Sequence, residues 1–263
     1  MKPADLEPHI IKQYNIEHIF PYVNMQMLLG RHLGVQGKVD RLLAEGHEKT
    51  VELKEKVDTL FSDANQLKTL QANAMYQFFP AQSDGNDLII YDPTNLKTEL
   101  ERFTFPRQQV KPYLCLADFV RPVGGEMDYV GFLAVTAGKG VRALGEAAKA
   151  RGEFLKSHLV QAAALETAEG LAERIHEQMR DRWGFPDAPE MSMSDRFSAK
   201  YQGIRVSFGY PACPNLEDQQ KLFDLLKPEK IGIELTEEFM MEPEASVTAL
   251  VFSHPEGRYF NVL

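Results

Sequence analysis

The sequence predicts an α+β fold: a single domain whose central twisted antiparallel sheet is flanked by helices and preceded by an N-terminal helical arm. Three observations lead to this prediction. Strand-like apolar stretches are grouped in the middle of the chain, helical patterns lie on both sides of that group, and two more strand-like stretches close the chain. Strands that are grouped in this way and bracketed by helices are typical of α+β proteins rather than of a regular βαβ alternation.

The first 24 residues are expected to form an arm that packs on the body of the domain. Prolines and aromatic side chains, among them Tyr14, Phe20 and Tyr22, are mixed there without a regular period. Residues 25–263 are then expected to form one domain, because a chain of 263 residues is within the reach of a single large core.

Two helical stretches come before the sheet. Residues 25–33 are interpreted as a short apolar helix that ends near Gly34, and residues 38–70 form a charged stretch with helical spacing. Apolar residues recur in the second stretch at intervals that place them on one face of a helix. We expect that face to contact the core through Val51, Leu53, Val57, Leu60 and Phe61.

The strands of the sheet are expected mainly between residues 74 and 137. Residues 75–80 and 88–91 are interpreted as two strands around a turn at 84–87. The later strand patterns are 100–105, which ends at Pro106, and two stretches apolar enough for central strands, 114–120 and 129–137, separated by a loop at Gly124 and Gly125.

A long helical stretch at 139–183 follows the strands, and Gly152 is expected to interrupt or bend it. Fewer signals mark the rest of the chain. The elements expected there are a loop at 186–194, a short helix at 195–201, a helix at 216–226 with Asn215 as its N-cap, and a last hairpin of 247–252 and 258–262 around residues 253–257.

One face of the long helix carries Glu166, Glu169, Glu173 and His176 at spacings of three and four residues. The Glu173-x-x-His176 pattern is that of a dimetal carboxylate bundle, but such a site needs a second copy of the motif on another helix. The sequence has no second copy. The face is therefore interpreted as a solvated acidic surface, no metal ligand is assigned, and a metal oxidase remains a minor alternative.

Composition excludes several classes of function. The formal net charge is −9 and no basic block occurs, which argues against nucleic acid and anionic membranes as partners. Cys115 and Cys213 stand in unrelated contexts and give neither a disulfide framework nor a zinc spacing. No apolar run approaches a membrane span, and the first residues lack the apolar core of a signal peptide, so a cytoplasmic location is expected.

The chain has no Gly-x-Ser-x-Gly elbow, Walker loop, His-Glu-x-x-His motif or glycine-rich dinucleotide loop. Its most distinctive stretch is residues 205–214. Two prolines stiffen the stretch, and Gly209, which has no Cβ, allows a ligand to approach the backbone. Arg205 lies four residues earlier and carries a planar fork suited to a carboxylate. The stretch fits either a rigid backbone cradle beside an anion clamp or a turn with a surface arginine.

Gly203-Ile204-Arg205 running into Gly209-Tyr210-Pro211-Ala212-Cys213-Pro214 resembles the signature of the C-terminal activation domain of cobalamin-dependent methionine synthase. Similar segments occur in order over residues 15–263, nearly the whole chain. They are Leu-Phe-Ser-Asp-Ala (60–64), Phe-Pro-Ala (79–81), Cys-Leu-Ala-Asp-Phe-Val (115–120), Asp-Tyr-Val-Gly (128–131), Val-Thr-Ala-Gly (135–138), Trp-Gly-Phe (183–185), Leu-Thr-Glu (235–237), Ala-Ser-Val (245–247) and Phe-Ser-His-Pro (252–255).

The resemblance implies a domain that binds S-adenosylmethionine and supports reductive methylation of cob(II)alamin to methylcobalamin, which restores an enzyme that makes methionine from homocysteine and 5-methyltetrahydrofolate. The chain would act as part of that methyltransferase and not alone, because it has no Asp-x-His-x-x-Gly cobalamin-ligand motif. A cobalamin-binding domain of the same enzyme would hold the cobalamin, and a flavodoxin or a flavoprotein reductase would supply the electron. The alternative is a non-catalytic docking module for a cobalamin-binding protein.

The resemblance also implies a ligand site that works mainly by positioning, so no catalytic residue is assigned. Arg205 would bind the carboxylate of S-adenosylmethionine, Asp63 would bind its amino group, and Tyr210 would face the corrin. Ala199 stands where some relatives carry a glutamate, six residues before the motif arginine, which leaves the role of that acid open. The other residues expected at the ligand are Glu169, Gly209, Tyr210, Pro211, Ala212, Cys213, Tyr259 and Phe260.

Overall fold

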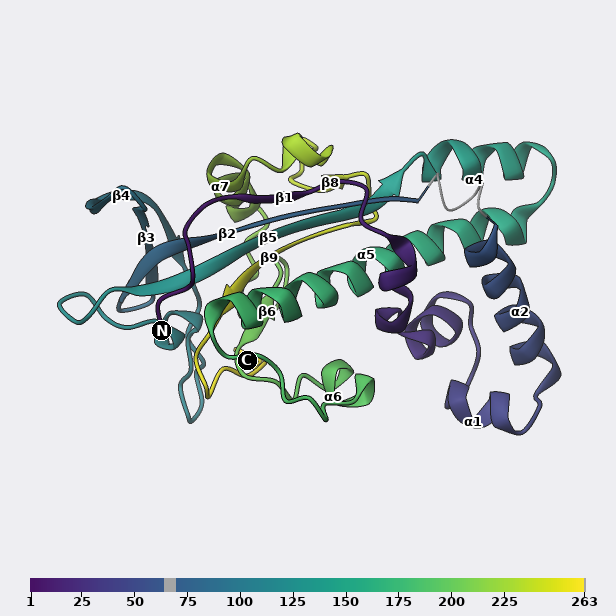
Figure 1. Cartoon of the computed structure of the whole chain (residues 1–263), viewed down its shortest axis with the longest axis horizontal. Coiled ribbons are helices and arrows are strands. Elements are labelled where there is room, and N and C mark those ends of the chain that lie inside the picture. The colour runs from purple at the N-terminus through teal and green to yellow at the C-terminus, as the bar shows by residue number, and fades with distance from the viewer. Residues whose placement is uncertain (64–69, 263) are drawn as a thin grey trace.

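The computed structural model describes residues 1–63 and 70–262, which are organised around a long antiparallel sheet (Figure 1). The strands of this sheet are β1 (His9–Ile11), β2 (Gln71–Asp84), β3 (Asp87–Asp92), β4 (Asn95–Thr104), β5 (Asp128–Lys139), β6 (Ile204–Val206) and β9 (Ser246–Phe252). Their order is β4-β3-β2-β5-β9-β6, and β1 pairs with β2 on the edge that β3 occupies further along. β2 and β5 pair over most of their length and form the middle of the sheet.

Helices cover both faces of the sheet (Figure 1). α5 (Phe154–Trp183) runs along one face, and α7 (Asp218–Leu226) lies on the other. α4 (Val141–Ala150) folds back on α5 through Gly152, whose φ of +78° favours glycine, so the predicted interruption is confirmed. The described chain also contains α1 (Val39–Ala44), α2 (Glu48–Ser62), α6 (Met193–Phe197), short helices at Ile16–His18, Phe20–Tyr22, Gln26–His32, Leu116–Phe119 and Pro228–Ile231, and a separate strand pair, β7 (Glu234–Leu235) with β8 (Met241–Glu242).

Both faces of the sheet are buried, which explains why its middle strands are apolar at successive positions. Side chains alternate between the two faces along a strand. In β5, Leu133 and Val135 belong to the core that includes α5, whereas Phe132 and Ala134 belong to the core that includes α7. The predicted class, an α+β domain with a central antiparallel sheet flanked by helices, is therefore confirmed.

The N-terminal residues join the sheet and then cross α5. β1 pairs with β2, and the short helix at Phe20–Tyr22 contacts α5 (Figure 1). Ile19 is fully buried at this crossing. Gly170 permits the close approach, because a Cβ on it would lie 3.1 Å from the backbone carbonyl carbon of Tyr22. A larger residue at this position would push the N-terminal segment away from α5.

Residues 114–120 are not the central strand that the sequence predicts. They contain one helical turn, Leu116–Phe119. Asp118 closes that turn, because its carboxylate accepts a hydrogen bond from the backbone N–H of Cys115 at 2.8 Å. The apolar side chains of the stretch are therefore buried by a turn packed on the sheet and not by pairing with a strand.

The hairpin predicted at the end of the chain is also wrong. β9 is a strand as expected, but residues 258–262 contain none. The second edge of β9 is occupied by β6, with Ile204 opposite Phe252, so the last residues have no edge to pair with. They lie beside β6 instead, where the Tyr259 hydroxyl donates a hydrogen bond to the Arg205 carbonyl at 2.9 Å.

Several other elements differ from the predictions at their boundaries. The helical stretch expected before the sheet is divided at Gly46 into α1 and α2, and its residues 64–69 lie outside those that the structure describes. α7 begins at Asp218 rather than directly after Asn215. Within residues 1–63 and 70–262, the helices are too short or too polar for any of them to span a membrane.

Candidate functional site

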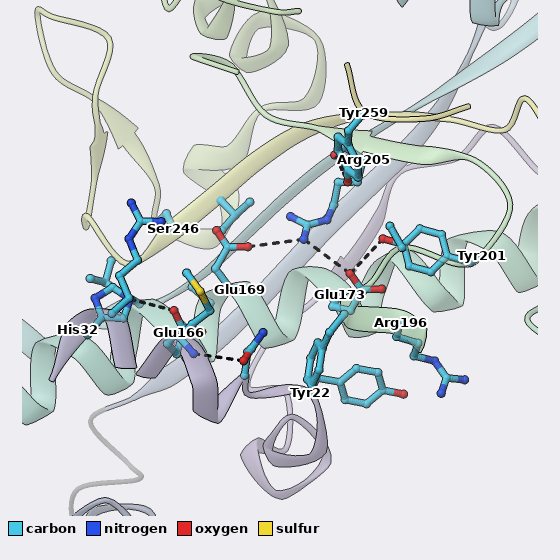
Figure 2. Close-up of a pocket in the computed structure, with 18 residues that line it drawn as sticks. Tyr22, His32, Glu166, Glu169, Glu173, Arg196, Tyr201, Arg205, Ser246 and Tyr259 are labelled. Carbon is cyan, nitrogen blue, oxygen red and sulfur yellow. Dashed lines mark hydrogen bonds and ion pairs between the residues drawn. The ribbon is translucent and has the colours of Figure 1, made fainter. Parts of the chain in front are cut away.

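A cavity of about 450 Å³ lies where α5, β6, the start of β9 and the N-terminal helices meet (Figure 2). Its walls come from residues that are far apart in the sequence, from Tyr22 to Tyr259. Acidic and basic side chains make up much of its lining: Arg31, His32, Glu166, Glu169, Glu173, Arg196 and Arg205.

Arg205 is fixed in the wall of this cavity by the strand that carries it. β6 pairs with β9, with Arg205 opposite Val251, and the Arg205 carbonyl accepts the hydrogen bond from Tyr259. The Arg205 side chain is 13% exposed, and its Nη2 atom lies 3.5 Å from Glu169 Oε2 and 3.8 Å from Glu173 Oε2. The Nε atom is buried and has no hydrogen-bond partner within the described part of the chain.

The charge on Arg205 is maintained by its neighbours. Burial disfavours a charged guanidinium, but Glu169 and Glu173 outweigh this effect and raise the pKa of Arg205. The Nη2 atom of the guanidinium thus faces two carboxylates of the protein, and the buried Nε atom has no hydrogen-bond partner among residues 1–63 and 70–262. A planar cationic fork is suited to binding a carboxylate.

The two glutamates beside Arg205 are in different environments. The side chain of Glu169 is 55% exposed, whereas that of Glu173 is 10% exposed. Burial raises the pKa of Glu173, although the nearby Arg205 and Arg180 oppose this shift. The Tyr201 hydroxyl donates to Glu173 Oε2 at 3.4 Å, but Oε1 is buried and accepts no hydrogen bond from the described residues.

The face of α5 that carries these glutamates is not the solvated acidic surface that the sequence predicts. Glu166, Glu173 and His176 are all buried, and the N-terminal helices pack on this helix. Glu169 alone among the four residues of that face keeps an exposed side chain. In the described ranges, no group of three or more histidine, cysteine, aspartate or glutamate side chains is arranged to hold a metal ion.

A buried cluster on α5 lies behind the cavity. Arg180 forms a two-point ion pair with Asp187, at 2.6 Å and 2.7 Å, and its guanidinium carbon lies 3.8 Å from the centre of the Tyr201 ring. His176 packs edge-on against the same ring and is completely buried. Burial holds the pKa of His176 well below its usual value, so the imidazole is neutral at physiological pH.

A hydrogen bond between His32 and Glu166 closes another part of the cavity wall. The Nε2 atom of His32 lies 2.9 Å from Oε1 of Glu166, which joins the Gln26–His32 helix to α5. Burial raises the pKa of Glu166, and His32 opposes this shift. The pair therefore helps to hold the N-terminal part of the wall in place.

The segment after β6 forms a tight turn next to the cavity, referred to below as the 209–213 turn. The N–H of Gly209 donates to the carbonyl of Cys213 at 2.8 Å, and the N–H of Cys213 donates to the carbonyl of Tyr210 at 2.7 Å. Gly209 has a φ of +88°, a region that favours glycine. Ala212 and Cys213 are buried. Burial raises the pKa of the Cys213 thiol to about 12, so the thiol remains protonated.

Three of the ten residues predicted to contact a ligand line this cavity, and the 209–213 turn meets them through one ring contact. Glu169, Arg205 and Tyr259 line it. The rings of Tyr210 and Tyr259 meet edge-on with 5.6 Å between their centres, which places the 209–213 turn directly behind Tyr259. The sequence motif therefore corresponds to one continuous region of the structure.

Two other predicted residues lie elsewhere. Phe260 is buried and packs against Phe119 in the core. Asp63 ends α2 and is not among the residues that line the cavity. Ala199, which stands where some relatives carry a glutamate, does line the cavity and therefore leaves that wall without a carboxylate at its position.

Glu173 is the residue near Arg205 that sequence reasoning did not assign to the site. A signal was present, because Glu173 follows Glu169 by four residues and therefore shares its helical face. Nothing in the sequence indicates that Tyr201 and the N-terminal helices would cover this face. The contacts of Glu173 depend on elements whose relative placement the pattern of residues does not encode.

Comparisons with known proteins agree with one another. Residues 15–263 match the family described as vitamin B12 dependent methionine synthase, activation domain. The chain is 38% identical over 206 residues to methionine synthase of Mycobacterium tuberculosis and 37% identical over 207 residues to that of Mycobacterium leprae. Each alignment covers 73% of this chain but only 17% of the relative. A crystal structure of the MetH reactivation domain bound to AdoHcy has a TM-score of 0.91 and 32% identity, over 100% of this chain and 84% of that chain.

Proposed function

Since this chain belongs to the family of vitamin B12 dependent methionine synthase activation domains, we propose that it binds S-adenosylmethionine beside Arg205 and positions its methyl group for reductive methylation of cob(II)alamin. Cobalamin, held by a different domain, would supply the cobalt centre that takes up one electron and the methyl group, and S-adenosylhomocysteine would be the leaving group. The result would be to restore an enzyme that makes methionine from homocysteine and 5-methyltetrahydrofolate. The residues described here would contribute binding and alignment, which are the main requirements of such a transfer.

The arrangement of charges in the cavity carries this proposal. S-adenosylmethionine has a carboxylate next to an ammonium group and a sulfonium, so its site needs a cation beside anions. Arg205 lines the cavity and has an Nε atom without a hydrogen-bond partner among the described residues, and the exposed carboxylate of Glu169 lies 3.5 Å from its Nη2 atom. The solved structure that resembles this chain holds AdoHcy, the demethylated form of the same ligand.

We assign the amino acid part of the ligand to three charged residues. Arg205 would bind the carboxylate, and Glu169 would contact the ammonium group. Asp63, at the end of α2, is the second carboxylate proposed for the ammonium group. Because the carboxylate and the ammonium group share one carbon, this role requires Asp63 to come close to Arg205 when the ligand binds. These roles follow the charges of the ligand and of the protein.

The adenosyl part is assigned to the region around the 209–213 turn. Tyr259 is 43% exposed as a residue and lines the cavity, so its ring offers a flat surface for adenine. Phe260 would support this surface from the core. The backbone of Gly209, Pro211, Ala212 and Cys213 would hold the adenosyl group, and Tyr210 would face the corrin.

Isothermal titration calorimetry with S-adenosylmethionine tests the proposal. We expect saturable binding by the unmodified chain, and we expect Arg205→Ala to weaken it by about 1.5–3 kcal/mol, the usual range for a hydrogen bond to a charged group. Arg142→Ala is the matched control. Arg142 is ion-paired with Glu242 at 2.9 Å and does not line the cavity, so its removal should leave the affinity unchanged.

Two outcomes would contradict the proposal. Folded protein that shows no heat of binding at millimolar S-adenosylmethionine would remove its basis. Binding of a cobalamin-containing domain without any effect of S-adenosylmethionine would favour the alternative function, a non-catalytic docking module.

The proposal extends to partners and location. The curated relatives are much longer than this chain, which covers 17% of their length, so we assign the cobalamin-binding module to the same enzyme. A flavodoxin or a flavoprotein reductase would supply the electron. The location that we propose is the cytoplasm. Cys115 and Cys213 are buried free thiols, which agrees with the reducing conditions there.

A further inference from the structure

Arg205 has two protein carboxylates within reach, and their surroundings give them different roles. Resting on the proposed function, we propose that Glu173 is the positioning residue for Arg205. Glu173 contacts the Nη2 atom of the guanidinium and so fixes the orientation in which Arg205 meets the ligand carboxylate. Glu169 then remains available to the ammonium group of the ligand.

The two carboxylates differ more in their burial than in their distance from Arg205. Glu169 is slightly closer to Nη2, at 3.5 Å against 3.8 Å for Glu173, but its side chain is 55% exposed and that of Glu173 is 10% exposed. An exposed ion pair is weakened by solvent screening and by the freedom of its side chains. A buried pair is screened much less, so Glu173 is the partner that can fix the guanidinium.

Other buried groups hold Glu173 itself in place. Tyr201 donates a hydrogen bond to its Oε2 atom at 3.4 Å, and Arg180 Nη2 lies 3.9 Å from its Oε1 atom. Arg180 is in turn fixed by its two-point ion pair with Asp187. The carboxylate of Glu173 therefore lies between two guanidinium groups, one on its own helix and one on β6.

The segment before β6 supplies no carboxylate to Arg205, because Ala199 stands where some relatives carry a glutamate. That residue lines the same cavity, so a glutamate there would be near the ligand site. In this chain α5 supplies the carboxylates that Arg205 contacts, and both come from positions on one helical face. Arg205 is consequently oriented without an acid from the segment before β6.

Two ligands can be compared to show whether Glu173 positions Arg205 or only maintains the general structure of the cavity. S-adenosylmethionine and 5′-methylthioadenosine share the adenosyl group, but only S-adenosylmethionine carries a carboxylate. Glu173→Gln keeps the shape of the side chain and removes its charge. We expect it to weaken S-adenosylmethionine binding about tenfold or more, as loss of a charged contact does, and to leave 5′-methylthioadenosine binding unchanged.

A double-mutant cycle gives a second readout that does not depend on the smaller ligand. If Glu173 acts through Arg205, Glu173→Gln should have no further effect in an Arg205→Ala background. Asp218→Asn is the matched control, because Asp218 is also a buried carboxylate paired with a cation, Lys221 at 3.0 Å, but on α7 across the sheet. Glu173→Asp, which keeps the charge but withdraws it from Arg205, serves the same comparison if the glutamine variant does not fold.

The outcomes separate this inference from the proposed function. If Arg205→Ala loses affinity and Glu173→Gln does not, the positioning role is overturned and the proposed function stands. Equal losses for both ligands, or full additivity in the double variant, would also overturn it. Absence of S-adenosylmethionine binding by the unmodified chain would overturn the proposed function itself.

Discussion

At Arg205 a side chain stays charged although burial opposes the charge, and two glutamates from α5 are the reason. The neighbouring His176 shows the opposite result of the same burial. It faces Arg180 and Arg205, has no carboxylate within hydrogen-bond distance in the described ranges, and is therefore kept neutral. A charged Arg205 on β6 and a neutral His176 on α5 thus lie near each other in the same buried region.

His176 is expected to make folding sensitive to acid. Its pKa in the folded chain lies well below the usual 6.5, so below about pH 6.5 the unfolded chain binds a proton that the folded chain does not. Stability should therefore fall as the pH decreases through that window, by up to about 1.4 kcal/mol per pH unit for one proton. His176→Leu should remove this part of the slope.

Urea unfolding of both proteins at several pH values between about 7 and 5 measures the difference. Glu166 and Glu173 also titrate, but they are present in both proteins and cancel in the comparison. Equal slopes for the two proteins would show that His176 gains its proton in the folded state.

Part of this site could be predicted from the sequence. Arg205, Glu169 and Tyr259 were predicted from the resemblance, and they line one cavity. Glu173 and His176 were predicted to face solvent, because helical spacing shows which residues share a face and not what covers that face. The covering segments lie more than 100 residues earlier in the chain or follow α5, and local patterns carry no information about them.

At the scale of elements, β6 is short, and its position depends on Gly203. This glycine has a φ of +81°, and a Cβ on it would lie 2.3 Å from the carbonyl oxygen of Phe252. Gly203→Ala should displace β6 from β9 and with it Arg205. We expect a loss of more than about 1–2 kcal/mol, the cost of the left-handed conformation alone, together with weaker S-adenosylmethionine binding.

Thermal unfolding and titration calorimetry of the same variant measure both effects. Gly85→Ala is the control, because Gly85 has a φ of +62° but open space around its Cβ position. It should lose stability through conformation only and should bind the ligand normally. Similar affinities for the Gly203 variant and the unmodified chain would show that β6 does not set the position of Arg205.

The elements themselves were predictable where one local pattern was decisive. β2, β3, β5 and β9 follow from apolar runs bounded by turns, and Gly152 marks the boundary of α4 and α5 as expected. Residues 114–120 were assigned to a strand because a buried turn and a buried strand are equally apolar. Residues 258–262 were assigned to a hairpin because the sequence does not show that β6 occupies the edge of β9.

For the whole molecule, we propose that residues 1–24 are an arm that packs permanently on the domain. Ile19 is 0% exposed and Val23 4% exposed in this arm. Deleting residues 1–24 should therefore lower the free energy of unfolding by at least about 3 kcal/mol, since burial of each such side chain contributes roughly 1.5–3 kcal/mol. Urea unfolding of the shortened chain measures this loss, and an unchanged midpoint would indicate a detached linker.

The cavity is bounded by Tyr22 near one end of the chain and by Tyr259 near the other. During synthesis, the whole segment between these two residues must leave the ribosome before the cavity can form and hold the proposed methyl donor. Contacts between such distant residues form late because they close long loops. In a refolding experiment, binding of S-adenosylmethionine should consequently be among the last properties to recover. Fragments released by proteolysis should not bind it.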